Sequence, residues 1–394
     1  MLERLFQLKA HNTTVRTEVL AGLTTFLTMA YILFVNPNML AETGMDKGAV
    51  FVATCLAAAL GSAIMGLLAN YPIALAPGMG LNAFFTYTVV MTMGYSWQTA
   101  LGAVFLSGAI FFLLSIFKIR EWIINSIPLA LRAGIAAGIG LFLAIIALKN
   151  AGIVVDHPAT LVGLGDMSNG GALLACLGFF VIAALAYRKV TGAVMIGILL
   201  VTALSIILGL SELPGVVSMP PSLMPTLLQL DIAGALDIGL VSVIFAFLFV
   251  DLFDTSGTLV GVAQKADLLD KDGKMPRLGR ALLADSTATM AGAALGTSTT
   301  TSYIESAAGI SAGGRTGLTA CVVAALFLLS LFFAPLAGSV PAYATAPALL
   351  FVAVLMMSSL AQIDWDDLTV AAPVVIAALA MPLTFSIANG IAFG

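Results

Sequence analysis

The chain has 394 residues, of which 60% are hydrophobic and 9% are charged, and its formal net charge is −4. Soluble domains carry roughly 25% charged residues, so the composition excludes an ordinary soluble domain. It predicts an all-α polytopic membrane protein. The first 18 residues are charged and lack the apolar core and small-residue cleavage site of a signal peptide. We expect them to form a short amphipathic helix on the cytoplasmic face.

Apolar runs long enough to cross a bilayer recur along the whole chain. A span needs about 20 apolar residues, or fewer where a helix is broken. We expect 14 spans, at residues 17–35, 49–69, 71–90, 97–117, 121–148, 172–188, 191–210, 236–262, 280–295, 298–314, 316–337, 344–362, 367–381 and 382–394. With the N-terminus in the cytoplasm, most of the 16 Lys and Arg residues fall on the cytoplasmic side, in keeping with the positive-inside rule.

The order of the spans predicts an inverted repeat. Seven spans precede the polar segment at 211–235 and seven follow it, so two halves of one fold would have opposite orientations. Repeats of this kind build a site at the bilayer midplane from discontinuous helices. The third span contains Pro77, Gly78 and Gly80, which disfavour a continuous helix, and the tenth contains the hydroxyl-rich run GTSTTTSYIES. We expect both to be broken, with short extended stretches, and to mark a binding site.

Glu305 is the main candidate residue of the tenth span. A carboxylate at membrane depth normally faces a bundle interior or an aqueous cavity and marks a substrate or ion path. We expect Glu305 near the start of a half-helix, with Ser306 able to donate a hydrogen bond to a ligand. Asn82 has the matching place in the third span, as a ligand group or as a helix cap. The hydroxyls of 297–302 either contact the ligand or satisfy the broken backbone.

The eighth span carries a second polar group. Asp251, Asp254, Thr255 and Thr258 follow i, i+3, i+4, i+7 spacing and so share one helical face. Two carboxylates one turn apart cannot easily both ionise in a low-dielectric site, so the pair suits a proton carrier. The alternative is that both lie at the cytoplasmic end of the helix and are merely solvated. Asp285 in the ninth span is a second-rank candidate for a salt bridge or helix pairing.

No pattern predicts an enzyme. The sequence has no Ser-His-Asp or Walker motif and no His pair, and its three cysteines lie in apolar runs without a disulfide or metal spacing. We expect a transporter, not an enzyme or a structural membrane protein, with no metal and no cofactor beyond a proton gradient as driving force.

Several long stretches resemble the AzgA-like purine permeases of the nucleobase–ascorbate transporter superfamily. They are TEVLAGLTTFLTMAYILFVNP, ALAPGMGLNAFF, FVDLFDTSGTLVGVAQKADLLD and TSYIESAAGISAGGRTGLTA. The resemblance implies a core domain made of residues 14–120 and 236–340, and a gate domain made of residues 121–211 and 341–394. It implies a homodimer formed through the gate domains, and a last span that would continue past Gly394.

The resemblance also implies the roles of the candidate residues. Asp251 and Glu305 would hold the nucleobase together with Asn82, while Asp251, Asp254 and Glu305 would couple the proton. Independently of the resemblance, we expect Phe84 either to stack on the ring of the base or to pack in the core. We therefore expect proton-coupled uptake of hypoxanthine and guanine, with adenine as a further candidate, across the inner membrane and with no nucleic acid partner. The alternative is a carrier of anions, uracil or xanthine on the same fold, although a carboxylate at Glu305 disfavours anions.

Overall fold

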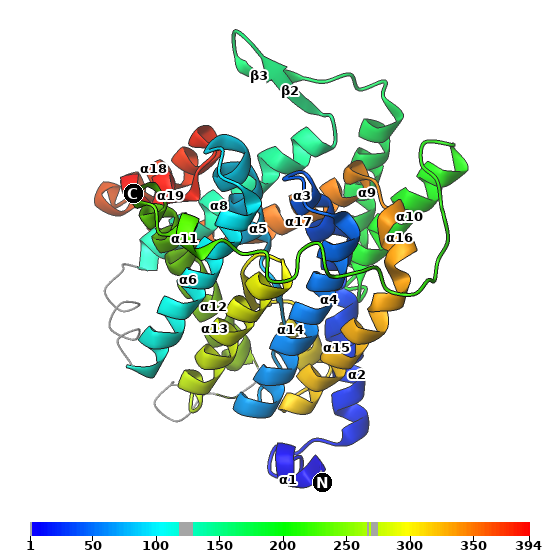
Figure 1. The fold of residues 1–394 in the computed structure, drawn as a ribbon, viewed down its shortest axis with the longest axis vertical. Helices are drawn as coiled ribbons and strands as arrows, with labels where there is room; N and C mark the ends of the chain where they lie inside the picture. The colour runs from blue at the N-terminus through cyan, green and yellow to red at the C-terminus, as the bar shows by residue number, and fades with distance from the viewer. Residues whose placement is uncertain (1, 118–128, 266–267, 269–274) are drawn as a thin grey trace. The chain divides into compact units, whose positions relative to one another are not determined.

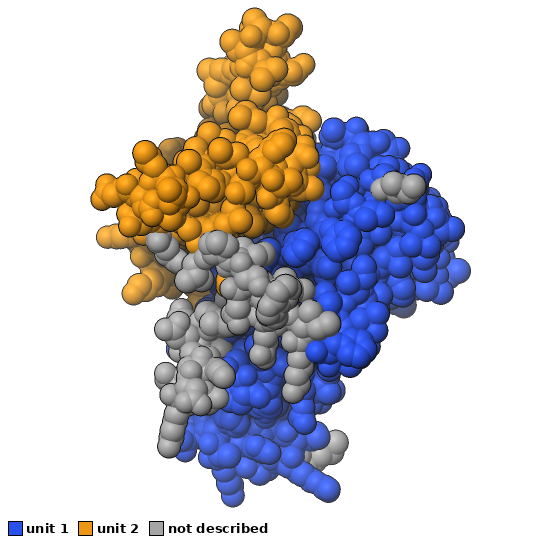
Figure 2. All heavy atoms as spheres, turned by 90° about the vertical axis from the view of Figure 1, so that its left-hand side faces the viewer, with its two compact units in different colours: residues 1–125, 219–334 blue, residues 126–218, 335–394 orange. Residues whose placement is uncertain are grey.

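The computed structural model describes residues 2–117, 129–265, 268 and 275–394. The chain divides into two compact units, shown in Figure 2: unit 1 contains Met1–Asn125 and Met219–Ala334, and unit 2 contains Ser126–Ser218 and Pro335–Gly394. Each unit therefore combines one segment from each half of the chain. The domain boundary expected at 120–121 lies outside the described residues.

The chain is mostly helical, and seven of the described helical segments are long and apolar enough to cross a membrane. They are Val15–Ala41, Lys47–Ala69, Trp97–Ile116, Ala130–Asn150, Gly170–Tyr187, Gly317–Ser339 and Ala342–Ala361. Two shorter apolar helices cover Ala193–Ile207 and Leu368–Thr384. Length and composition thus confirm a polytopic membrane protein.

Unit 1 contains the two segments expected to be broken. Its first part comprises α1 (Leu2–Phe6), α2 (Val15–Met29), α3 (Ile32–Ala41), α4 (Lys47–Ile64), η1 (Met65–Ala69), β1 (Leu75–Pro77), α5 (Met79–Ala83), η2 (Phe84–Thr92) and α6 (Trp97–Ile116). Its second part comprises α11 (Ile232–Ala235), η3 (Ile238–Leu240), α12 (Val241–Lys265), α13 (Leu278–Leu295), β4 (Thr300–Ser302), α14 (Ser306–Ser311), α15 (Gly317–Ser330) and η4 (Leu331–Phe333). Figure 1 labels most of these helices.

Polar residues fix where the helices of unit 1 begin. Asp46 accepts a hydrogen bond from the Ala49 N–H at 2.7 Å at the start of α4, and Ser96 caps α6 in the same way. Such caps satisfy amide groups that the helix itself leaves without a partner. At the start of α15 the buried carboxylate of Glu18, from α2, accepts from the Arg315 N–H at 2.9 Å and the Thr319 hydroxyl at 2.6 Å. This contact ties α2 to α15.

The two broken segments pair with each other. β1 and β4 form an antiparallel two-stranded sheet, with Leu75 opposite Ser302 and Pro77 opposite Thr300. A half-helix follows each strand: α5 begins at Met79 and α14 begins at Ser306. The extended stretches expected in the third and tenth spans are therefore confirmed. The pairing satisfies backbone groups that lipid could not satisfy.

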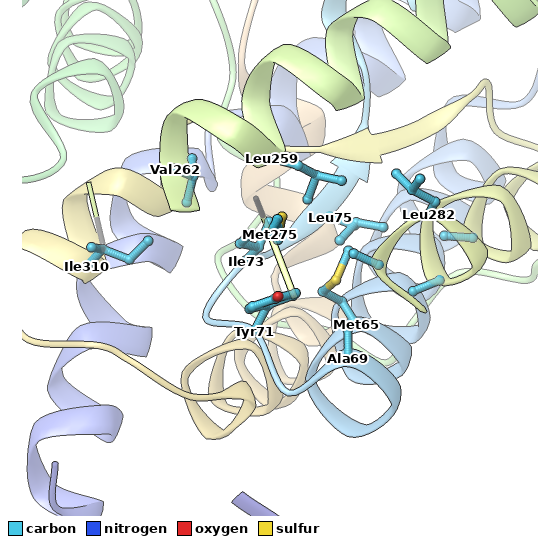
Figure 3. Packing of buried hydrophobic residues seen from close by; sticks show 13 residues of the cluster. Met65, Ala69, Tyr71, Ile73, Leu75, Leu259, Val262, Met275, Leu282 and Ile310 are labelled. Atoms are coloured by element: carbon cyan, nitrogen blue, oxygen red, sulfur yellow. The ribbon is translucent and has the colours of Figure 1, made fainter. Parts of the chain in front are cut away.

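A buried apolar cluster supports β1 from one side (Figure 3). Leu75 of β1 packs in a group with Leu259 of α12, Leu282 of α13 and Ile310 of α14. Tyr71 and Ile73 also belong to it, and all these side chains are at most 4% exposed. Because close-packed interiors resist displacement, the cluster holds the strand, the two long helices and the second half-helix in one rigid arrangement.

Unit 2 consists of helices from both halves of the chain. They are α8 (Leu129–Asn150), α9 (Gly170–Tyr187), α10 (Ala193–Ile207), α16 (Ala334–Ser339), α17 (Ala342–Met357), η5 (Ser358–Gln362), α18 (Leu368–Thr384) and α19 (Ile387–Phe393), with a hairpin of β2 (Val154–His157) and β3 (Leu161–Leu164). α8 packs on α17 and α18. The Ser359 hydroxyl donates to the Ala133 carbonyl at 2.9 Å, and Ala133, Ile363 and Val374 form a small apolar core.

Candidate functional site

Glu305 stands at the start of α14, as the sequence predicted. It occupies the N-cap position of that half-helix and is only partly exposed. Its Oε1 accepts a hydrogen bond from the Tyr31 hydroxyl at 2.6 Å. Tyr31 lies at the break between α2 and α3 and is 2% exposed. Sequence reasoning missed Tyr31, because a tyrosine inside an apolar span gives no sign of which distant carboxylate it will meet.

The two aspartates of α12 have different surroundings. Asp251 is fully buried and accepts from the Thr255 hydroxyl at 3.2 Å and the Thr289 hydroxyl at 3.4 Å. Asp254 is exposed. The spacing does place both on adjoining parts of one helix face, but only Asp254 is accessible. Asp251 belongs to a polar network in the interior.

Asp285 joins that network and is more central than its sequence rank suggested. Its Oδ2 lies 3.0 Å from the Thr255 hydroxyl, which also lies 3.2 Å from Asp251. Its Oδ1 accepts from the Ser302 hydroxyl of β4 at 2.8 Å. Asp285 therefore links α13 to α12 and to β4. Of the two predicted roles, a salt bridge or helix pairing, these bonds to hydroxyl groups correspond to helix pairing.

Asn82 is not a helix cap. Gly78 holds the N-cap position of α5, and the Asn82 N–H donates to the Gly78 carbonyl at 2.8 Å as an ordinary helical bond. The Asn82 side chain is fully buried, yet neither Oδ1 nor Nδ2 has a hydrogen-bond partner among the described residues. Buried amides nearly always have partners. An amide without one, on a half-helix in a membrane protein, is a group suited to a polar ligand.

Phe84 and Ser306 are both fixed by contacts within unit 1: Phe84 by ring packing and Ser306 by a hydrogen bond. Phe84 is fully buried and meets Phe247 of α12 edge to face, with ring centroids 5.0 Å apart. The Ser306 Oγ accepts from the Ala74 N–H at 3.0 Å, which joins α14 to the residues before β1 and leaves the hydroxyl hydrogen for another acceptor. The Tyr303 hydroxyl donates to the Pro77 carbonyl at 2.5 Å and adds a second link between the broken segments.

The side-chain hydroxyls of residues 297–302 differ in their hydrogen bonding. Thr297 accepts from the Asn36 amide at 2.8 Å, and Ser302 donates to Asp285. The side-chain hydroxyls of Ser298, Thr299 and Thr300 are buried and bond to no other described group. Of the two alternatives for this run, satisfying the broken backbone does not apply to these three hydroxyls within the described residues, and contact with a ligand stays a prediction. In the part of the chain that the structure describes, no group of three or more His, Cys, Asp or Glu side chains could hold a metal ion.

Comparison with known sequences identifies a family along almost the whole chain. A model described as the permease family matches residues 16–393. The chain is 54% identical over 394 residues to the adenine permease AdeP of Escherichia coli (strain K12), covering 100% of this chain and 88% of AdeP. It is 48% identical over 405 residues to the guanine/hypoxanthine permease PbuG of Bacillus subtilis (strain 168), covering 100% of this chain and 92% of PbuG.

Comparison with solved structures supports the fold. The transmembrane domain of the cyanobacterial bicarbonate transporter BicA superposes with a TM-score of 0.72, covering 95% of this chain and 97% of that one. The two sequences are 15% identical, so the likeness concerns the fold alone.

Proposed function

Because the chain belongs to the permease family of the nucleobase–ascorbate transporters, we propose that it imports purine nucleobases across the cytoplasmic membrane with protons. It is a transporter and not an enzyme. Relatives named for adenine and for guanine and hypoxanthine support the purine class. The oxopurines implied by the family resemblance, and adenine, the substrate named for AdeP, are both candidates for the preferred base.

One observation carries the proposal. Glu305, a partly exposed carboxylate, stands at the N-terminus of a half-helix, while the other half-helix contributes Asn82, whose amide has no partner among the described residues. In the proposed complex Glu305 accepts the N1–H of an oxopurine or the exocyclic amine of adenine. The positive dipole end at the helix N-terminus favours the C6 carbonyl of an oxopurine. Asn82 and the hydroxyl of Ser306 complete the polar contacts, and Phe84 supplies part of the apolar wall.

The buried network supports proton coupling. The single hydroxyl hydrogen of Thr255 lies within reach of both Asp251 and Asp285, and both carboxylates are fully buried. A buried carboxylate is costly when it is ionised, so this arrangement favours a proton on one of the two. In the proposal Asp254 and Glu305 receive the proton at the accessible side, and Asp251 lies in the buried network next to them.

Alternating access requires two bodies that move against each other. We propose unit 1 as the substrate-binding core and unit 2 as the gate, within a fold of seven plus seven inverted spans with the N-terminus in the cytoplasm. In the proposed homodimer the gate units form the contact between subunits. All the candidate site residues belong to unit 1, so the site can be carried as one piece.

The test is uptake of radiolabelled hypoxanthine by cells that lack their own purine permeases. We expect saturable uptake that a protonophore abolishes and that guanine or adenine competes, whereas uracil, xanthine and bicarbonate do not. A carrier for anions or for other nucleobases would show the reverse competition.

The matched variant is Glu305→Ala. It removes the proposed acceptor and leaves polar partners without a bond, which costs about 1–3 kcal/mol or more for a charged group. We expect uptake to be lost while the protein remains in the membrane. Retained saturable uptake in this variant would show that the site has been assigned wrongly.

A further inference from the structure

Tyr31 is the protein group that bonds to the Glu305 carboxylate. The phenol donates to Oε1 at 2.6 Å, a short distance typical of a hydroxyl bonded to an ionised oxygen. No other described side chain donates a hydrogen bond to the carboxylate, and Oε2 is left on a partly exposed side chain.

The tyrosine itself is held rigidly. It lies at the break between α2 and α3, between Ala30 and Ile32, neither of which is exposed. The Tyr31 carbonyl accepts from the Phe34 N–H at 3.0 Å, and the Ala30 carbonyl accepts from the Leu33 N–H at 3.1 Å. A phenol side chain has few rotatable bonds and this one is 2% exposed, so its hydroxyl is a fixed hydrogen-bond donor for the more flexible glutamate.

We infer that Tyr31 is a positioning residue: it fixes the Glu305 carboxylate through Oε1 so that Oε2 faces the purine as a single, oriented acceptor. The inference rests on the proposed function and assigns to the first span a part in substrate recognition. It also concerns selectivity. A carboxylate bound at one oxygen suits a ligand with one N–H at that edge, as in hypoxanthine. Guanine presents N1–H and an adjacent amine, and gains more from two unrestricted oxygens.

Loss of the phenol hydroxyl should therefore affect binding more than turnover. In Tyr31→Phe the carboxylate loses its anchor, a hydrogen bond that is stronger than one between neutral groups. We expect the KM for hypoxanthine to rise about tenfold, which corresponds to about 1.4 kcal/mol, with the maximal rate within about twofold of the wild type. The KM for guanine should rise less, so the ratio between the two bases should shift toward guanine.

Tyr71→Phe is the matched control. Tyr71 is also buried in unit 1, at 1% exposure, but its hydroxyl accepts from the Arg277 N–H at 3.1 Å and lies in the apolar cluster of Figure 3. The Tyr71→Phe variant also loses a buried phenol hydroxyl, but none of the described hydrogen bonds joins this hydroxyl to Glu305. We expect an unchanged KM for both bases in this variant.

A double-mutant cycle shows whether Tyr31 acts through Glu305. Glu305→Asp keeps the charge but is one methylene shorter, so its oxygens withdraw from Tyr31. If Tyr31 acts only through that contact, adding Tyr31→Phe to Glu305→Asp raises the KM no further. Purine-dependent thermal stabilisation of the purified variants gives the same comparison for binding alone.

The outcomes separate the two proposals. An increased KM in Tyr31→Phe, the guanine shift and no further effect in the double variant support the inference. An unchanged KM, an equal rise for both bases, or KM effects that multiply in the double variant would overturn it while leaving purine uptake intact. A wild-type protein that neither takes up nor binds a purine would overturn the proposed function, and the inference with it.

Discussion

Asn82 shows how a binding group can reduce stability. Its amide is fully buried and has no partner among the described residues, and an unsatisfied buried polar group costs about 1–3 kcal/mol. Proteins commonly retain such costs at functional sites. In the proposed complex the purine would supply the hydrogen-bond partners that this amide lacks among the described residues.

The corresponding prediction concerns Asn82→Leu. Leucine has the same number and branching of side-chain heavy atoms as asparagine but no polar ones, so we expect the apparent Tm of the ligand-free protein in detergent to stay the same or rise. Purine-dependent stabilisation should disappear. Thermal unfolding of the wild type and the variant, each with and without hypoxanthine, measures both effects. A variant that unfolds earlier and still responds fully to the purine would contradict the assignment.

The aspartates of α12 mark the limit of sequence reasoning at this scale. The i, i+3 spacing predicted that Asp251 and Asp254 share one helical face, and both lie in the continuous helix α12. It could not tell which of them would be covered, because Asp251 is covered by Thr289 of α13, a residue from another span. The same limit applies to Tyr31 and Asp285. Tyr31 bonds to Glu305, and Asp285 bonds to Thr255 and Ser302, all residues from other elements of the chain.

At the scale of elements, the position of α14 depends on a close approach to α2. Gly309 in α14 faces α2 so tightly that an added Cβ would lie 2.1 Å from the Thr25 Oγ1 and 2.5 Å from the Ala21 carbonyl oxygen. The carbonyl belongs to the helix backbone and cannot turn away. Only glycine permits this approach, and α14 carries Glu305 at its start.

Gly309→Ala should therefore displace the half-helix. Overpacking of this kind costs about 1–3 kcal/mol, and misplacing Glu305 should reduce purine uptake more strongly than it lowers the amount of protein in the membrane. The control is Gly279→Ala in α13, where no described atom lies within 4 Å of the added Cβ. We expect normal uptake there. Equal uptake by the two variants, normalised to membrane content, would argue against this packing requirement.

The sequence predicted that the third and tenth spans are broken, but not that their extended stretches pair with each other. Pro77, Gly78 and Gly80 and the hydroxyl run indicated where continuous helix ends. Two strands of three residues have no periodicity that could reveal a partner, so the pairing of Leu75 with Ser302 could not be read from the sequence. That pairing depends on the cluster and the helices around it.

At the scale of the whole molecule, the candidate site lies entirely in unit 1. Asn82, Asp251, Asp254 and Glu305 all fall within Met1–Asn125 or Met219–Ala334. Ligand binding should therefore order one unit directly. The division into units follows contacts between distant segments, and the sequence anticipated it only through the family resemblance.

Hydrogen exchange tests this expectation. Saturating purine should slow amide exchange in peptides that contain β1, α5, β4 and α14, since binding to the native state suppresses local opening. Peptides of α9 and α10 in unit 2 should change little. Glu305→Ala with the same purine is the control and should show no protection. Protection that is equal in both units of the wild type would mean that the ligand is not bound by unit 1 alone.

The β1–β4 pair also constrains how the protein is made. The Tyr303 hydroxyl and the Pro77 carbonyl that it contacts are separated by 226 residues. At about 5–20 residues per second, a ribosome needs roughly 10 to 45 s to supply the second segment after the first. During that interval the backbone of β1 has no strand to pair with, and unpaired backbone groups in hydrocarbon cost several kcal/mol each. The first half of the chain must therefore be sheltered by its own helices or by the insertion machinery until translation delivers its partner.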